Sequence, residues 1–596
     1  MSTHVLATAG HVDHGKSTLI RALTGMEPDR WEEERRRGLT IDLGFAWTTL
    51  PSGREVAFVD VPGHQRFLAN TLAGLGPAPV VCFVVAADEG WRAQSSDHRD
   101  ALAALGIRHG LIVVTRADRA PDRAPEVLAQ ARDELAGTGL RDAPGVVVSA
   151  VDGTGLTELR ATLDRVLEQL PAPETTARVR LWVDRSFTIT GAGTVVTGTL
   201  AAGTLARGDR LNLLDADRPQ SVVIRGLQSR GEPYPRLGPV ARVALNLRGV
   251  SRDVIQRGSA LVTPGAWVST GTLDIRRTTG GPMTDAAARL VVHVGTAAVP
   301  ARLRPFDDDH GRLTLDRPLP LVLGDRLVLR DPGGQRVLGG AMVLDADPPV
   351  LRRRGDGTRR AAALSALDAA GDVGAEVARR GAVRESHLRR LGFVSSAIPE
   401  SVRVLDDWWV HAATFQAWQQ RLRAAVEELH ARDSLAEGLS RGAARDLLAL
   451  PDESLLDGVT RDAGLEQRGG HIRMPGARDD LGRAEAAVGE LEARLRAEPF
   501  DAPEADDLSA LQLSARELAA AERAGRVLRL RDGVVLLPSA PALAMRELAR
   551  LAQPFTTSQA RQALNTTRRV AIPLLEHLDA RGWTRRLDAG HREVVR

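Results

Sequence analysis

The chain of 596 residues has almost no lysine. Lys16 is the one lysine among 79 basic residues, and all the others are arginine. Arginine serves as well as lysine wherever a position needs only positive charge, so a single surviving lysine marks a place that needs the compact ammonium group. We therefore expect Lys16 to have a chemical role.

Cysteine and aromatic residues are also scarce. The chain has one cysteine, Cys82, which excludes an intrachain disulfide and a cysteine-based metal cluster. Cys82 lies in the apolar run 80–86, where we expect it to be buried. Aromatic residues make up 3% of the chain, hydrophobic residues 43% and charged residues 26%. Apart from the few aromatics, these values are typical of a soluble globular protein.

Long apolar runs are missing as well. No uninterrupted run reaches the roughly 18 residues of a membrane span, and the start of the chain does not read as a signal peptide. We expect a cytoplasmic protein with no membrane partner. The net charge of +3 makes the pI near 9.7 weak evidence for nucleic-acid binding. The length predicts about four to seven domains.

Lys16 belongs to the sequence Gly-His-Val-Asp-His-Gly-Lys-Ser, residues 10–17. In the pattern G-x-x-x-x-G-K-[ST], backbone N–H groups surround phosphates and the lysine reaches β- and γ-phosphate oxygens. An apolar strand over Val5–Ala9 and a helix over Ser17–Leu23 supply the context that this loop requires. The predicted phosphate-binding residues are Val12, Asp13, His14, Gly15, Lys16, Ser17 and Thr18.

Two further segments predict a metal-dependent phosphate site. Asp60 follows the strand 56–59, where its carboxylate can hold Mg²⁺ through water, and the N–H of Gly63 can approach a γ-phosphate. Thr40, in the segment 37–42, can add a hydroxyl beside that of Ser17. The predicted Mg²⁺ ligands are therefore Ser17, Thr40 and Asp60.

The next two segments predict guanine recognition. Strand 111–114 ends in Thr115-Arg116-Ala117-Asp118, and the Asp118 carboxylate can accept the N1–H and N2–H of guanine, which adenine cannot match. The segment 146–150 ends in Ser149 and Ala150, where a backbone N–H can reach the guanine oxygen. This segment resembles the base-reading motif N-K-x-D of GTPases with Thr115 in place of the asparagine, and we expect the threonine to lose a side-chain hydrogen bond to the loop. Arg116 can lay its aliphatic stem on the base.

These motifs resemble those of translational GTPases that carry or position tRNA. G-H-V-D-H-G-K and D-V-P-G-H carry the resemblance, and a threonine at position 115 resembles the selenocysteine-specific factor. The resemblance implies that His64 orients the attacking water and that Gly63 and Thr40 sense the γ-phosphate; these three are the predicted catalytic residues. It also implies switch segments that GTP and Mg²⁺ order and hydrolysis releases. Asp13 either binds a monovalent cation or shapes the loop.

The middle of the chain is rich in short segments with β-strand patterns. Short β runs separated by turn residues predict two β-barrel domains, over 174–263 and 264–350, behind a GTP-binding domain over 1–173. Residues 191–198 resemble the hairpin that opens the second domain of tRNA-carrying factors. Asp184, Arg185 and Arg242 resemble the aminoacyl pocket of the selenocysteine factor, where arginines would suit an ionised selenol. Each of the three is equally compatible with an ordinary surface ion pair.

The last part of the chain contains a faint repeat of about 60 residues. Hairpin patterns at 465–475, 527–538 and 583–595 each follow helical stretches, and an earlier copy ends near 402–410. The pattern predicts tandem winged-helix modules over 351–430, 431–478, 479–538 and 539–596. A cluster of arginines in the last module predicts contacts with an RNA hairpin, the alternative being a solvated face. The residues in question are Arg568, Arg569, Arg585, Arg586 and Arg592.

The whole chain resembles a bacterial selenocysteine-specific elongation factor. The predicted fold is multidomain: an α/β P-loop GTPase domain, two β-barrels and tandem α+β winged helices. The resemblance implies a monomer that binds GTP/GDP and Mg²⁺ and delivers selenocysteinyl-tRNA to the ribosome at recoded UGA codons. The last winged helix would bind a selenocysteine insertion hairpin in the mRNA. Three alternatives stay open: another tRNA-binding translational GTPase, a DNA-binding regulator with a GTPase switch, and a metabolic GTPase scaffold.

Overall fold

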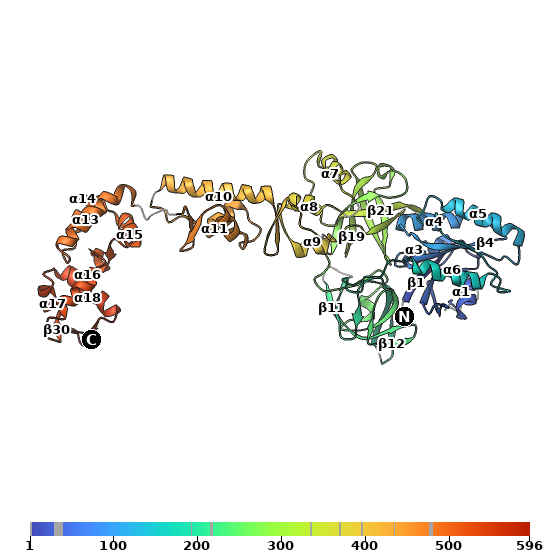
Figure 1. The fold of residues 1–596 in the computed structure, drawn as a ribbon, viewed down its shortest axis with the longest axis horizontal. Coiled ribbons are helices and arrows are strands. Elements are labelled where there is room, and N and C mark those ends of the chain that lie inside the picture. Colours follow the sequence, from blue (N-terminus) through green and yellow to red (C-terminus); the bar gives the residue numbers. More distant parts are fainter. Residues whose placement is uncertain are drawn as a thin grey trace. The chain divides into compact units, whose positions relative to one another are not determined.

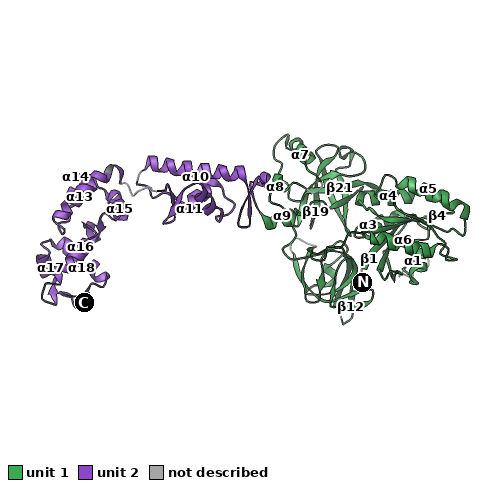
Figure 2. Ribbon diagram, viewed as in Figure 1, with its two compact units in different colours: residues 1–376, 384–398 green, residues 377–383, 399–596 purple. Residues whose placement is uncertain are grey.

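Figure 1 shows the chain as a computed structural model, which describes residues 3–28, 40–191, 193–214, 219–333, 336–368, 371–394, 397–433, 435–475 and 481–595. None of the helices in these ranges is long and apolar enough to cross a membrane. The chain divides into two compact units, one of residues 1–376 and 384–398 and the other of residues 377–383 and 399–596 (Figure 2). Residues 37–39 of the segment 37–42 lie outside the described residues, as does residue 192 of the hairpin pattern at 191–198.

The first domain is built on a six-stranded sheet with the strand order β2-β3-β1-β4-β5-β6. The strands are β1 Thr3–Ala9, β2 Gly44–Thr49, β3 Glu55–Asp60, β4 Val80–Ala86, β5 His109–Thr115 and β6 Gly145–Val147. All neighbours run parallel except the antiparallel pair β2 and β3. The carboxyl ends of β1, β3, β4 and β5 therefore meet at one edge, where open α/β sheets bind their ligands.

Helices cover both faces of this sheet (Figure 1). Helices α3 Leu68–Leu75, α4 Ala93–Leu105 and α5 Ala124–Leu135 pack on one face, and α1 Lys16–Thr24 and α6 Leu156–Glu168 on the other. Alternate residues of a strand point to opposite faces. Along β4, Phe83 therefore joins the first core and Cys82 the second. Cys82 is buried, as the sequence predicted.

The first barrel closes because β10 pairs with both β11 and β15 in the order β10-β15-β7-β8-β14-β11. Its strands are β7 Arg180–Ile189, β8 Gly193–Leu200, β10 Arg210–Leu214, β11 Gln220–Ser229, β14 Ala241–Arg248 and β15 Ala260–Val262, with short strands β9 Leu205–Ala206, β12 Glu232–Tyr234 and β13 Arg236–Leu237. The register between β7 and β8 shifts at residue 184. A bulge of this kind re-aims the side chain that it carries.

The second barrel is closed in the order β16-β19-β18-β17-β20-β21. Its strands are β16 Thr270–Arg277, β17 Arg289–Val294, β18 Ala297–Pro305, β19 His310–Leu319, β20 Arg326–Arg330 and β21 Val337–Asp345. This barrel packs on the first domain, since Val328 and Val337 join the core under α4. A Cβ at Gly340 would lie 2.6 Å from Ala104 Cα, so the approach of β21 to α4 requires a glycine.

A buried charge cluster attaches helix α7 Asp356–Ser365 to the second barrel. Arg360 Nε donates to Asp274 Oδ2 at 2.7 Å, and its Nη2 donates to Asp345 Oδ2 at 2.5 Å. Arg312 Nε donates to the other oxygen of Asp274 at 2.7 Å. Asp274 is fully buried and the other three are at most 9% exposed. Residues 351–376 thus belong to the barrel unit, and the first winged-helix module does not begin at residue 351.

Four helix-and-hairpin modules follow, and two of them have the full winged-helix order of helix, strand, two helices and hairpin. The second module has α10 Ala412–Arg432, β25 Leu439–Ser440, α11 Arg441–Leu448, α12 Leu455–Asp462, β26 Glu466–Arg468 and β27 His471–Arg473. The last has α16 Ala540–Leu548, β30 Phe555–Thr556, α17 Thr557–Ala563, α18 Arg568–Ala580, β31 Thr584–Arg586 and β32 His591–Val594. In both, the short first strand pairs with the last strand of the hairpin.

The other two modules are less complete. Of the first predicted module, the start of α8 Val373–Arg380 and helix α9 Glu385–Leu391 belong to the barrel unit, whereas β23 Val402–Leu405 and β24 Trp408–His411, which form one sheet with β22 Ala382–Arg384, belong to the other unit. The third module has α13 Glu485–Ala497, α14 Ala505–Ala510, α15 Ala515–Arg523, β28 Leu528–Arg529 and β29 Val535–Leu536. Helix α10 buries Phe415, Trp418 and Leu422 against α11 and α12. The second module therefore begins near residue 412, not at the predicted 431.

The buried cluster predicts a large effect for Arg360→Ala. This change removes the guanidinium that bridges the two buried carboxylates and leaves Asp274 with Arg312 as its ion-pair partner among the described residues, so we expect the barrel unit to lose about 3–5 kcal/mol of unfolding free energy. Arg359→Ala is the matched control, because Arg359 precedes Arg360 in α7, its side chain is 67% exposed, and its ion pair among the described residues is with Asp356. Arg359→Ala should lower the free energy of unfolding by less than about 0.5 kcal/mol. Calorimetry of the full chain measures both, and equal melting temperatures for the two variants would refute the prediction.

Candidate functional site

The phosphate loop of residues 10–17 lies at the carboxyl edge of the sheet, between β1 and α1. Asp13 and Gly15 have positive φ angles of 63° and 79°, a backbone shape that turns successive N–H groups toward one concavity. Gly10 has a φ of 128°, and a Cβ there would overlap Val84 O of β4. Helix α4 holds two amides of the loop, since His98 Nδ1 accepts from Gly10 N at 2.9 Å and Gln94 Oε1 from Val12 N at 3.2 Å.

A cavity of about 550 Å³ opens in front of this loop. The predicted residues that line it are Val12, Asp13, Gly15, Lys16, Ser17, Thr18, Thr40, Gly63, Thr115, Arg116, Asp118 and Ala150. Two other predicted nucleotide-binding residues, His14 and Ser149, are buried instead (0% and 1% exposed). Arg21, Glu27 and Arg119 also line the cavity, although no motif pointed to them.

The lysine is held in place by the loop itself. Lys16 is 6% exposed, and its Nζ donates to Gly10 O at 3.1 Å and to His11 O at 2.7 Å. A Cβ at Gly63 would lie 2.5 Å from this Nζ and would overlap Val12 N. The segment after β3 can therefore approach the loop only with glycine at position 63.

The three predicted metal ligands converge on one point. Ser17 Oγ donates to Asp60 Oδ2 at 2.6 Å and lies 3.1 Å from Thr40 Oγ1. Asp60 is fully buried, and Thr8 Oγ1 donates to its other oxygen at 2.7 Å. Burial raises the pKa of Asp60, although the charge of Lys16 and these hydrogen bonds oppose the rise. Two hydroxyls and a carboxylate form the all-oxygen donor set that Mg²⁺ prefers.

The structure does not bring His64 to the cavity. His64 is half-buried after β3 and is not a lining residue. Its Nδ1 accepts from Arg66 N at 3.1 Å and caps the short helix Gln65–Phe67. Its ring centroid lies 6.0 Å from that of Phe67. A catalytic role for His64 therefore requires a movement of this segment.

The expectation for Thr115 was wrong. Its hydroxyl donates to His14 O in the phosphate loop at 2.7 Å, so threonine keeps a side-chain hydrogen bond to the loop. Arg116 is in the left-handed region, with a φ of 55°, and its guanidinium bonds Asp13 O and Glu89 Oε1, the latter at 2.8 Å. Sequence reasoning missed the second contact because Glu89 lies 27 residues away and belongs to no motif.

A second cavity, of about 260 Å³, lies between the first domain and the first barrel. Phe45, Trp47 and Phe58 line it from the domain, and Arg185, Phe187, Thr197, Arg230 and Arg242 from the barrel. Arg242 places its Cζ 3.6 Å from the centroid of the Phe45 ring, a cation–π contact. The structure thus brings two of the three predicted pocket residues, Arg185 and Arg242, to one cavity.

Asp184, the third predicted pocket residue, forms an ion pair with Arg242. It is 5% exposed, lies at the bulge of β7, and accepts from Arg242 Nη2 at 2.8 Å and from Thr197 Oγ1 at 2.6 Å. Burial by itself raises the pKa of Asp184, but the charge of Arg242 and these hydrogen bonds outweigh it, and the pKa is lowered. The carboxylate is therefore ionised at neutral pH and fixes the Arg242 guanidinium.

The predicted RNA-contacting arginines have different surroundings. Arg568, at the start of α18, and Arg585 and Arg586, on β31, are exposed. Arg569 Nη2 instead donates to Ala502 O at 2.7 Å in the third module.

Arg592 is a correction to the predicted set. It is 6% exposed, and its Nε donates to Asp579 Oδ2 at 2.9 Å. Its Nη1 donates to Thr557 Oγ1 at 3.2 Å. Arg592 therefore supports the hairpin from inside the module and does not present its charge at the surface.

Three family models match the chain. Residues 1–169 match the elongation factor Tu GTP binding domain, residues 275–350 the beta-barrel domain of selenocysteine-specific elongation factor, and residues 546–592 the winged helix of elongation factor SelB. The selenocysteine-specific elongation factor of Escherichia coli (strain K12) is 30% identical over 619 residues, covering 98% of both chains. The chain belongs to the selenocysteine-specific elongation factor family.

Two further relatives agree with this assignment. The selenocysteine-specific elongation factor of Desulfomicrobium baculatum is 28% identical and covers 98% of both chains. A crystal structure of bacterial selenocysteine-specific elongation factor EF-Sec matches with a TM-score of 0.77 and 24% identity over 100% of both chains, which confirms the predicted fold class. The chain is thus a translational GTPase with the function of a selenocysteine-specific elongation factor. The DNA-binding regulator, the metabolic scaffold and other tRNA-binding GTPases are not favoured.

The Thr115 contact predicts how this member of the family holds nucleotide. Thr115→Val leaves His14 O without its buried donor, which should cost about 1–2 kcal/mol and weaken GDP binding roughly 5- to 30-fold. Thr115→Ser keeps the hydroxyl and is the matched control, with an expected change of less than about twofold. Equilibrium titration with a fluorescent GDP measures both constants. Wild-type affinity in the valine variant would show that the hydrogen bond contributes nothing to binding.

Proposed function

We propose that the 550 Å³ cavity binds GTP, with its phosphates on the loop of residues 12–18. Asp118 and the backbone at Ser149 and Ala150 would recognise guanine, and Arg116 would cover the base. The convergence of the loop, the single lysine and the guanine-reading segment on one cavity supports this assignment.

We propose Ser17, Thr40 and Asp60 as the residues that hold Mg²⁺. Their convergence, with Ser17 Oγ within 3.1 Å of an oxygen of each of the others, supports the assignment. The cation, when bound, neutralises phosphate charge. Thr40 and Gly63 would sense the γ-phosphate, and His64 would orient water once the ribosome has moved its segment toward the cavity.

The contacts of Asp42 suggest how nucleotide state reaches the second cavity. Asp42 lies two residues after Thr40, and its Oδ1 accepts from Arg257 Nη2 of the barrel at 2.5 Å. Its Oδ2 lies 3.5 Å from Arg185 Nη2, which lines the second cavity. A movement of Thr40 between nucleotide states would therefore shift Asp42 and change its contacts with Arg257 and Arg185 of the barrel.

We propose that the second cavity receives the aminoacyl group of selenocysteinyl-tRNA. A selenol has a low pKa and is an anion at neutral pH, so the guanidinium groups of Arg185 and Arg242 would favour it. A serine hydroxyl is neutral and would gain little. The two arginines at one cavity support this proposal, and the tRNA, the ribosome and a cytoplasmic location follow from the same function.

The test compares GTP-dependent binding of selenocysteinyl-tRNA with that of the same tRNA charged with serine. We expect a preference of more than about tenfold, or roughly 1.4 kcal/mol. Arg242→Gln should bring the ratio close to one and leave serine affinity nearly unchanged. Arg248→Gln, at the exposed end of the same strand β14, is the control and should keep the preference. Equal binding of both tRNAs by the wild type would remove the selenol-binding role.

We propose that the last winged helix binds a selenocysteine insertion hairpin in the mRNA through Arg568, Arg585 and Arg586. All three are exposed, Arg568 at the start of α18 and Arg585 and Arg586 on the wing. A factor that holds both RNAs on one chain raises the effective concentration of the right tRNA only near that hairpin.

Single alanine variants at Arg568, Arg585 and Arg586 should each weaken hairpin binding and lower the slope of log affinity against log salt by about one. Arg546→Ala is the control, because Arg546 is an exposed arginine of the same module on α16. Electrophoretic mobility shifts at several salt concentrations measure both quantities. An unchanged affinity in all three variants would place the RNA elsewhere.

A further inference from the structure

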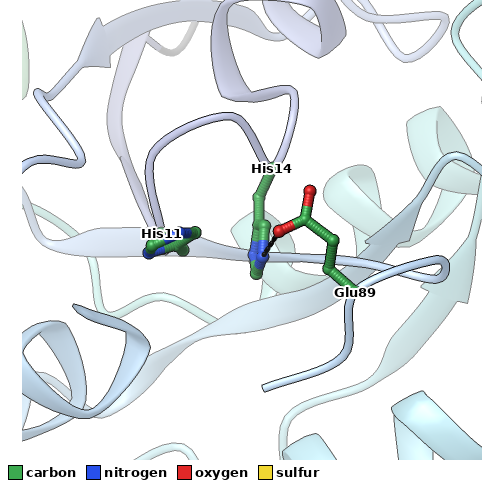
Figure 3. Close-up of side chains that lie close together, drawn as sticks. All are labelled: His11, His14 and Glu89. Atoms are coloured by element: carbon green, nitrogen blue, oxygen red, sulfur yellow. Dashed lines mark ion pairs between the residues drawn. The ribbon is translucent and has the colours of Figure 1, made fainter. Parts of the chain in front are cut away.

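Three metal-binding side chains lie together behind the phosphate loop (Figure 3). His11 and His14 come from the loop, and Glu89 comes from the segment that follows β4. One possible ligand atom of each lies within 4.8 Å of those of the other two, and this is the one such group among the residues that the structure describes. None of the roles proposed above uses this group as a set.

The ring of His14 has one nitrogen in use and one without a partner. His14 is fully buried, and its Nδ1 lies 3.4 Å from Val84 O, to which it can donate only as N–H. The other nitrogen, Nε2, then carries a lone pair, is buried without a hydrogen-bond partner, and lies 3.8 Å from Glu89 Oε2. Two electron-rich atoms that face each other at this distance can both ligate a cation placed between them.

His11 also has a ring nitrogen without a hydrogen-bond partner. Its Nδ1 is also buried without a hydrogen-bond partner, and its ring centroid lies 4.9 Å from that of His14 in an edge-on arrangement. Burial lowers the pKa of both histidines, that of His14 to about 3. At neutral pH both rings are therefore neutral and offer lone pairs.

The two oxygens of Glu89 have separate surroundings. Oε1 accepts from Arg116 Nη1 at 2.8 Å, and Oε2 faces His14, with Arg92 Nε at 3.7 Å. One oxygen is thus free to ligate while the other keeps a hydrogen-bond donor that orients the carboxylate. Ligating carboxylates and histidines are commonly supported in this way, and here Val84 O and Arg116 supply the support.

We propose that His11, His14 and Glu89 form a binding site for a divalent transition-metal ion such as Zn²⁺. Two imidazoles and one carboxylate are a donor set that suits Zn²⁺ and leaves a fourth position for water. Mg²⁺ prefers oxygen ligands and would not compete for the imidazoles. Such an ion would link the phosphate loop, through His11 and His14, to the segment after β4, through Glu89.

The test uses the full-length protein, freed of metal by a chelator and then loaded with GDP and excess Mg²⁺. Titration with Co²⁺ should give the visible absorption of a low-coordinate site at one equivalent, and Zn²⁺ should remove this absorption. Zn²⁺ should also raise the melting temperature of the wild type by linkage. Co²⁺ that replaced Mg²⁺ at Ser17, Thr40 and Asp60 would have six oxygen ligands and absorb only weakly, so that site would not give this signal.

Two single variants locate the site on separate segments, so that a folding defect in one does not decide the result. His11→Gln and Glu89→Gln should each weaken Zn²⁺ binding at least tenfold, with circular dichroism confirming the fold. His591→Gln is the control, because His591 is an exposed histidine whose ion pair among the described residues is with Asp588, at 3.1 Å, and its replacement should not change Zn²⁺ binding. No absorption in the wild type, or wild-type affinity in both test variants, would overturn the proposal.

Discussion

The close contact between the phosphate loop and strand β4 positions the loop and, with it, Lys16. Gly10 lies against Val84 O, so a side chain at residue 10 would push the loop away from the sheet. From β4, α4 and β5, the groups of Val84, His98 and Thr115 then hold the loop at defined points. The loop is thus fixed to the sheet edge at several points, and the backbone carbonyls of Gly10 and His11 orient Lys16.

A second set of contacts joins this edge to the barrel. Asn70 Nδ2 donates to Ile41 O at 2.9 Å, and Arg257 bonds both Asn70 and Asp42. The segment that carries Thr40 is therefore held by the barrel on one side and by Ser17 on the other. These contacts act on three consecutive residues, so a displacement of Thr40 would be passed to the barrel contact of Asp42.

Several arginines act inside the protein, although most lie partly or fully at the surface. Arg180 makes a bidentate pair with Asp325 and lies over the Trp267 ring, Arg360 bridges two buried aspartates, and Arg592 supports the last hairpin. These planar groups satisfy several acceptors at once. The count of arginines was for this reason a poor guide to RNA contacts, and exposure separates Arg568 from Arg592.

The sequence by itself determined the sites whose functional residues are close together in the chain. The phosphate loop, the segment 60–64 and the segment 115–118 each place their functional atoms within a few residues, and short hairpins are local too, so motif and fold class were predictable. The tertiary structure alone decided the contacts between distant residues. Glu89 faces His14 across 75 positions, Thr115 reaches His14 O across 101, and α10 joins the second module because its apolar face packs there. Such pairings depend on how strands and helices pack in space, and no local pattern records them.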